Sequence, residues 1–145
     1  WEATQWALAQ DTSLNTFIPN DYGVPYGYSS VFFAPAQPTA RQERLYRRFL
    51  AATARGYRAV ATHPKQAAGE LLGAINHENY QDSALLRASF QRVAPALLQE
   101  GQWGRQAATK YQRYLRWVKA QNLWKSIQAL RSEDVFTNRY FAPQQ

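Results

Sequence analysis

The chain has 145 residues, of which 46% are apolar and 14% aromatic, enough to fill one hydrophobic core. It has no cysteine and only two histidines, which excludes disulfides, thiol nucleophiles and a histidine-based metal site without carboxylate help. The net charge of +7 fits nucleic acid, anionic lipid, an acidic protein or no such partner at all. Because the aromatic residues fall on apolar helix faces that a core requires, we predict no nucleic-acid partner.

The first residue is Trp1 and the sequence has no methionine, so we expect a processed, truncated or partial product. No apolar run approaches the roughly 20 residues that cross a bilayer. The compartment stays open at this point.

Residues 1–10 combine Trp6 and Leu8 with good helix formers, which predicts a helix ended by the polar residues 11–13. A short strand, Thr16-Phe17-Ile18, is expected next, and residues 27–34 are expected to form a second strand.

Between these strands Gly23, Pro25 and Gly27 alternate as breakers and predict a tight turn that presents Tyr22, Tyr26 and Tyr28. A rigid aromatic turn suits a flat ligand, and a packed tyrosine corner without a ligand fits the spacing equally well.

A long helix is predicted over residues 39–63, because Thr39 and Gln42 have the spacing of a capping box and Pro64 ends the helix. Apolar and basic residues separate onto two faces of this helix. The apolar face, which we expect to be core, holds Leu45, Phe49, Ala52, Gly56 and Val60; the basic face holds Arg41, Arg44, Arg48, Arg55 and Arg58. The basic face is either a solvated surface or a partner-binding surface.

Three more helices and one short turn follow. Pro64 opens a helix through Ile75, with His77 in the loop after it, and Asp82 or Ser83 caps another that holds Leu85, Leu86 and Phe90. The last long helix covers about 105–122, with Leu115 and Val118 on its apolar stripe, and Ser132 is expected to cap one last turn.

No catalytic constellation is present. The sequence lacks a phosphate-binding glycine loop, a nucleophile elbow and a histidine pair at helical spacing. Glu133 and Asp134 are adjacent, so they point apart on a helix and favour its N-terminus instead of acid–base work. We therefore expect no enzyme activity, no cofactor and no metal site.

Several pieces in this order resemble one family. They are residues 21–29 followed by an apolar strand, Phe49–Tyr57, His63-Pro64 with Ala67-Ala68, Trp103-Gly104 and Val135–Phe141. Together they are similar to the C-terminal half of thiamine-pyrimidine-synthesis and thiamine-precursor-binding proteins, which group with the sulfonate and taurine solute-binding proteins of ABC importers. Phe136-Thr137-Asn138 is the most specific single match.

The resemblance implies an α/β class: the C-terminal part of a type 2 periplasmic-binding-protein fold, mostly helical here with two short strands. Residues 1–20 would end the second lobe, residues 21–34 would form the hinge turn and strand, and residues 35–145 would supply the C-terminal helices of the first lobe.

The resemblance also implies a ligand site built from Trp1, Glu2, Tyr22, Tyr26 and Tyr28. The ring of Trp1 would stack on an aminopyrimidine, and the carboxylate of Glu2 would accept from its exocyclic amine. An exposed helix terminus is the alternative interpretation of Glu2. The family's His- and Cys-rich segment is missing, so synthesis of the pyrimidine is not implied.

Two hypotheses follow. The first is a binding protein for a thiamine-precursor pyrimidine or similar heterocycle, periplasmic if bacterial. The second is a non-catalytic accessory or structural subunit of a larger assembly, which could include membrane proteins. This subunit would be located in a mitochondrion or plastid. In both, an N-terminal half or another protein chain would cover the apolar faces.

Overall fold

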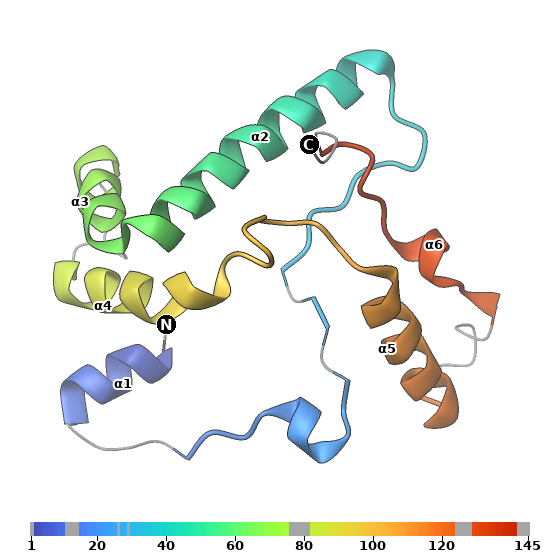
Figure 1. Ribbon diagram of the computed structural model, residues 1–145, viewed down its shortest axis with the longest axis horizontal. Coiled ribbons are helices and arrows are strands. Elements are labelled where there is room, and N and C mark those ends of the chain that lie inside the picture. The colour runs from blue at the N-terminus through green and yellow to red at the C-terminus, as the bar shows by residue number, and fades with distance from the viewer. Residues whose placement is uncertain are drawn as a thin grey trace. The chain divides into compact units, whose positions relative to one another are not determined.

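The computed structural model describes residues 2–10, 15–25, 27–28, 30–75, 82–123 and 129–141, and these are mostly helical (Figure 1). The chain divides into two compact units. The first unit comprises residues 1–15 and 49–104, and the second comprises residues 16–48 and 105–145. The helix α2 (Ala40–Thr62) contributes residues to both units.

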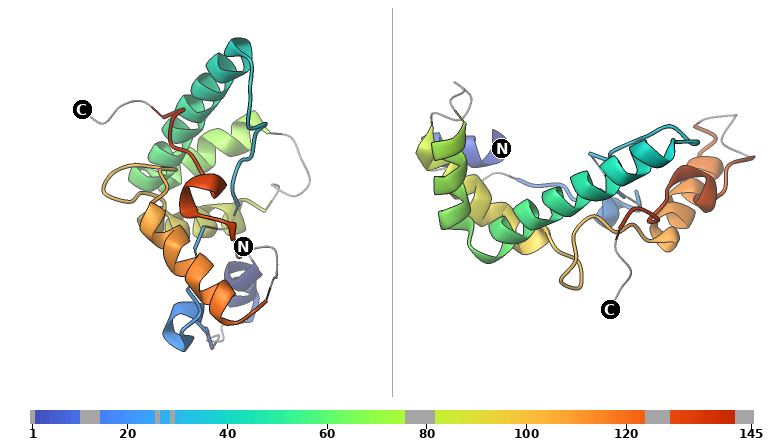
Figure 2. Two further views of the ribbon diagram at one scale, coloured as in Figure 1. Left: turned by 90° about the vertical axis from the view of Figure 1, so that its right-hand side faces the viewer. Right: turned by 90° about the horizontal axis from the view of Figure 1, so that it is seen from above.

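In the first unit, α4 is the central helix. It packs against α3 on one side and α1 on another, and α3 lies beside α4 in Figures 1 and 2. The bounds are Glu2–Gln10 for α1, Pro64–Ala74 for α3 and Ser83–Val93 for α4, followed by the 3-10 turn Ala94–Ala96.

The core of the first unit lies where α3 meets α4. Leu85 and Leu86 of α4 are buried, and the side chain of Leu86 is only 1% exposed. Opposite them Ala67 and Ala68 are buried on α3, and these small side chains let the two helix backbones approach closely. The two helices were predicted, and the structure shows that they bury these side chains against each other.

Local capping signals place the helix starts as predicted. The backbone N–H of Thr39 donates to Gln42 Oε1 at 2.8 Å, and the N–H of Gln42 donates to Thr39 Oγ1 at 3.3 Å. Asp82 caps α4, because its Oδ1 accepts from the backbone N–H of Leu85 at 2.9 Å. Pro64 opens α3 directly after α2 ends.

The second unit contains the 3-10 turn η1 (Pro19–Tyr22), α5 (Ala108–Ala120) and the short α6 (Ser132–Val135). Leu115 and Val118 are buried on α5, with Trp117 and Leu130 packed against them. The ammonium of Lys119 donates to the carbonyl of Leu130 at 3.0 Å, which fixes the approach to α6 alongside α5.

The prediction of two strands was wrong for the part of the chain that the structure describes. Residues 15–18 and 31–35 belong to no strand or helix, Ser30 forms a bend, and Phe33 is 97% exposed. A strand is stabilised by a partner strand, and none lies beside these segments among the described residues. Among the described residues the only β-bridge is the isolated antiparallel pair Gln99 and Gln102.

The apolar face of α2 was also mispredicted as core. None of the described residues of this 23-residue helix is buried, and Leu45 is 61% exposed. The periodicity predicted the helix correctly, but a stripe becomes core only when another element covers it.

The cap of α6 is Arg131, one residue before the predicted Ser132, and its backbone N–H donates to Asp134 Oδ2 at 3.0 Å. His77 lies outside the described residues. The assignment of residues 1–20, 21–34 and 35–145 to lobes stays a prediction. No helix in the described ranges is long and apolar enough to span a bilayer.

Candidate functional site

The turn predicted around Tyr22 to Tyr28 begins, in the structure, with a single 3-10 turn over Pro19–Tyr22 that ends at Gly23. Pro19 opens it at a first-turn position, and Gly23 ends it with φ +75°, a conformation that costs glycine little. The backbone N–H of Val24 donates to the carbonyl of Pro19 at 3.0 Å. This geometry leaves the ring of Tyr22 67% exposed, with Phe17 at 5.9 Å between ring centroids. Tyr22 is thus accessible to a ligand.

Tyr28, a few residues further on, anchors this segment to the start of α5. Its hydroxyl accepts from the backbone N–H of Ala107 at 2.8 Å, and its ring centroid lies 5.5 Å from that of Tyr111. The ammonium of Lys110 lies 4.9 Å from the centroid of the Tyr28 ring. The described contacts of Tyr28 therefore occupy both its hydroxyl and its ring.

Tyr111 stacks in turn on Phe136, at 4.8 Å between centroids and 6° between planes. Its hydroxyl donates to Gln106 Oε1 at 3.0 Å. Burial, and secondarily the neighbouring Tyr28, raises the pKa of Tyr111 above its ordinary value. Tyr28, Tyr111 and Phe136 thus form an aromatic cluster beside the start of α5.

Two hydrogen bonds from the side-chain amide of Asn138 join the C-terminal segment to the residues just before α5. Asn138 Oδ1 accepts from the backbone N–H of Gln106 at 3.0 Å, and Asn138 Nδ2 donates to the Gln106 carbonyl at 2.7 Å. Sequence reasoning marked Asn138 through the resemblance but did not predict this role. Gln106 was missed altogether, because a pair 32 residues apart leaves no local signal.

The same C-terminal segment contacts the first turns of α2. Arg139 forms an ion pair with Glu43 at 3.1 Å, and Arg47 donates to the carbonyl of Arg139 at 2.7 Å. The rings of Tyr46 and Tyr140 meet edge to face at 5.4 Å. Residues 136–141 therefore hold α2 and α5 together within the second unit.

Glu2, the remaining described candidate, is exposed in the first turn of α1, where a carboxylate is favourable at the positive end of the helix dipole. It belongs to the first unit, whereas Tyr22 and Tyr28 belong to the second. Trp1 and Tyr26 lie outside the described residues. The structure therefore describes three of the five candidates, and two of these, Glu2 and Tyr22, are exposed.

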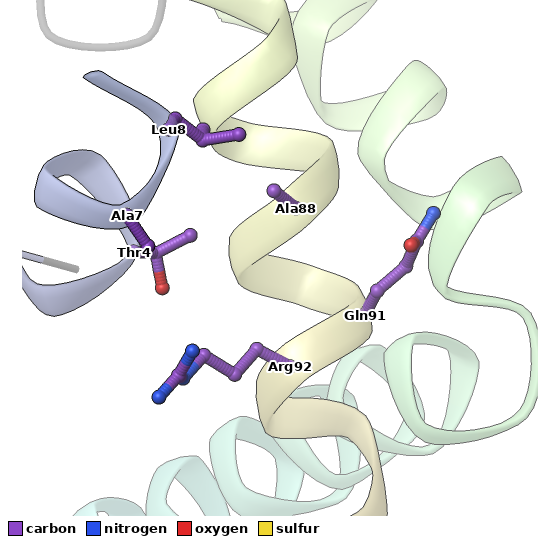
Figure 3. A pocket seen from close by; sticks show the side chains of 6 residues that line it. All are labelled: Thr4, Ala7, Leu8, Ala88, Gln91 and Arg92. Carbon is purple, nitrogen blue, oxygen red and sulfur yellow. The ribbon is translucent and has the colours of Figure 1, made fainter. Parts of the chain in front are cut away.

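An open hollow of about 400 Å³ lies between α1 and α4 in the first unit (Figure 3). Leu8 points toward α4, and Arg92 is the one charged side chain among the described residues of the lining. No second acid or base lines the hollow among the residues that the structure describes, and these residues suggest no reaction. Within the described ranges no three His, Asp or Glu side chains gather into a metal-binding group.

Comparison with protein families identifies one match. Residues 1–67, of the 145 in the chain, match the family described as NMT1/THI5 like. This range includes the turn at 21–29, Phe49–Tyr57 and His63-Pro64, and it supports the resemblance to thiamine-pyrimidine and solute-binding proteins over that part of the chain. The pieces Trp103-Gly104 and Val135–Phe141 lie beyond the match. No curated protein and no solved structure gave a significant match.

Proposed function

We propose that this chain contributes to a non-catalytic binding protein for a small heterocyclic solute, with a thiamine-precursor pyrimidine as the first candidate. The observation that carries the proposal is the family match over residues 1–67, which contains the aromatic turn and α2. The family suggests a solute- or precursor-binding class on a periplasmic-binding fold, and the ABC-importer relation is part of the proposal.

The resemblance assigns ligand contacts to Tyr22 and Glu2, which the structure describes in separate units, and to the predicted Trp1 and Tyr26. Tyr22 offers an exposed ring for stacking, and Glu2 offers an exposed carboxylate for an exocyclic amine. Tyr28 is proposed as a positioning residue, because its hydroxyl accepts from the backbone N–H of Ala107 at the start of α5.

The ligand class is tested by isothermal titration of the purified protein with 4-aminopyrimidines and, separately, with alkylsulfonates. The proposal predicts saturable heat with the aminopyrimidine and none with the sulfonate, because Glu2 accepts a hydrogen bond from an amine and repels an anion. Saturable heat with the sulfonate alone would reject the heterocycle. Absence of heat with both, from protein that melts cooperatively, would reject the function.

A second candidate function is an accessory or structural subunit of a larger assembly. The observation that favours it is α2, which extends for 23 residues without a buried residue among those described. Large apolar side chains are exposed elsewhere too, among them Trp6, Phe17, Ile18, Val31, Phe32 and Leu123. Surfaces of this kind are typical of interfaces.

Size-exclusion chromatography with light scattering on the isolated chain separates the two functions. An obligate subunit is expected to self-associate or precipitate alone, and to become monodisperse only with a partner that buries more than roughly 1,000 Å². A soluble monomer that melts cooperatively would contradict the subunit hypothesis.

A further inference from the structure

A second hollow, of about 440 Å³, opens between α5 and residues 130–133 in the second unit. One wall is α5, which presents Gln112, Arg116 and Lys119. Because these residues are spaced by four and three positions, they share one face of the helix. The opposite wall presents Arg131, Ser132 and Glu133.

The hollow lies beside the buried cluster of Leu115 and Val118 in the second unit. Leu115 is buried at its base, and Leu130 packs on the same cluster from the opposite wall. Ser132 is buried as well, and its hydroxyl accepts from Gln112 Nε2 at 3.5 Å while it donates to Glu133 Oε2 at 3.1 Å. These contacts tie the two walls together and give the hollow a defined shape.

The cations on the two walls differ in how their charge is balanced. The guanidinium of Arg131 faces two carboxylates, those of Asp134 at 3.2 Å and Glu133 at 3.4 Å. Arg116 and Lys119 form no ion pair with any described residue. Two positive charges that pair with no described carboxylate therefore lie one helical turn apart on the α5 wall.

Both of these cations keep hydrogen-bond donors that the described part of the chain does not occupy. Lys119 donates one of the three N–H groups of its ammonium to the carbonyl of Leu130, at 3.0 Å. Arg116 donates its Nε–H to the carbonyl of Gln112 at 3.4 Å. The two terminal NH₂ groups of its guanidinium remain as donors for a ligand. Each bond to a backbone carbonyl also restrains the side chain on the hollow side of the helix.

We propose that this hollow binds the phosphate group of a small molecule, with Arg116 and Lys119 as the ligating residues. A guanidinium fork beside an ammonium matches a tetrahedral oxyanion that accepts several hydrogen bonds. A volume of about 440 Å³ exceeds that of inorganic phosphate, so the organic part of a phosphate monoester lies over Leu115 and Leu130. Glu133 opposes the anion and keeps the affinity moderate.

The site is tested by two-dimensional amide NMR of the ¹⁵N-labelled chain during titration with inorganic phosphate at low ionic strength. Saturable shifts are expected at residues 112–119 and 130–133. Arg116→Gln is expected to weaken binding about tenfold, the loss of one charge-assisted hydrogen bond. Arg58→Gln removes the same charge from an exposed position on α2 and is expected to leave the affinity unchanged.

A gain of affinity completes the test, because a misfolded variant does not produce one. Glu133→Gln removes the opposing carboxylate and is expected to tighten phosphate binding about threefold. Phenyl phosphate is expected to bind more tightly than inorganic phosphate, because its ring covers the partly buried Leu130.

Three results would overturn the proposal. They are no saturable shift at these residues, equal weakening by Arg116→Gln and Arg58→Gln, and no advantage for phenyl phosphate. The aminopyrimidine titration above uses an uncharged ligand and different residues, so each proposal can fail without the other.

Discussion

Replacing Asn138 by alanine tests how the C-terminal segment is held. The side chain makes two hydrogen bonds to the backbone of Gln106, at 3.0 Å and 2.7 Å, and both are partly buried. Each contributes about 1 kcal/mol net. Asn138→Ala is therefore expected to lower the free energy of unfolding by about 2 kcal/mol, equivalent to a decrease in Tm of roughly 6 °C for a chain of this size.

The second variant, Asn138→Asp, separates the two bonds. It keeps the acceptor for the Gln106 N–H but turns a carboxylate oxygen toward the Gln106 carbonyl, so it is expected to cost at least as much as alanine. Gln5→Ala removes an exposed amide on α1 and is expected to change the stability by less than about 0.5 kcal/mol.

Urea denaturation followed by circular dichroism measures these differences, and amide hydrogen exchange locates them. Faster exchange is expected at residues 105–111 in both Asn138 variants. If Asn138→Ala loses less than about 0.5 kcal/mol, or if exchange at 105–111 is unchanged, the two bonds do not hold the segment.

Three further predictions concern stability. Leu86→Ala, in the α3–α4 core, is expected to cost about 2–5 kcal/mol in urea denaturation, whereas Leu8→Ala at an exposed position is expected to cost under about 1 kcal/mol; equal losses would refute the core assignment. Asp82→Ala removes the cap of α4 and is expected to cost about 1 kcal/mol, and Asp82→Asn, which still caps, should recover most of it. Hydrogen bonds from Arg131 lower the pKa of Asp134 below its ordinary value. The ionised Asp134 therefore stabilises the fold fully when the pH is above the ordinary pKa, and this stabilisation is lost as the pH falls through the lowered pKa of the folded state. Asp134→Asn should flatten stability against pH in that acid range, and an unchanged profile would contradict the pairing.

Elements whose signals are local in sequence were predicted well. The capping box at Thr39 and Gln42 needs only residues three apart, and so does the cap at Asp82. The core positions Leu115 and Val118 follow from helical periodicity over two turns. In these cases the physical cause and the sequence signal occupy the same few residues.

Features that depend on distant partners were mispredicted or missed. Residues 16–18 and 27–34 have strand-forming composition, but pairing decides whether they form strands, and the described residues offer no partner. The hydrogen bond from the backbone N–H of Ala107 to the hydroxyl of Tyr28 joins residues 79 apart. The sequence predicted Tyr28 as a ligand contact and gave no sign of this bond. Side-chain spacing within a turn carries no information on such contacts.

The affinity of the purified protein for a 4-aminopyrimidine, compared between Tyr22 and Glu2 variants, tests the proposed function most directly. Tyr22→Ala and Glu2→Gln are each expected to weaken binding about tenfold, through loss of a ring contact and of a charge-assisted hydrogen bond. The matched control Tyr114→Ala removes a partly exposed tyrosine from α5 and is expected to bind like the unaltered protein. Unchanged affinity in Tyr22→Ala and Glu2→Gln, or an equal loss in all three variants, would contradict a ligand site at these residues.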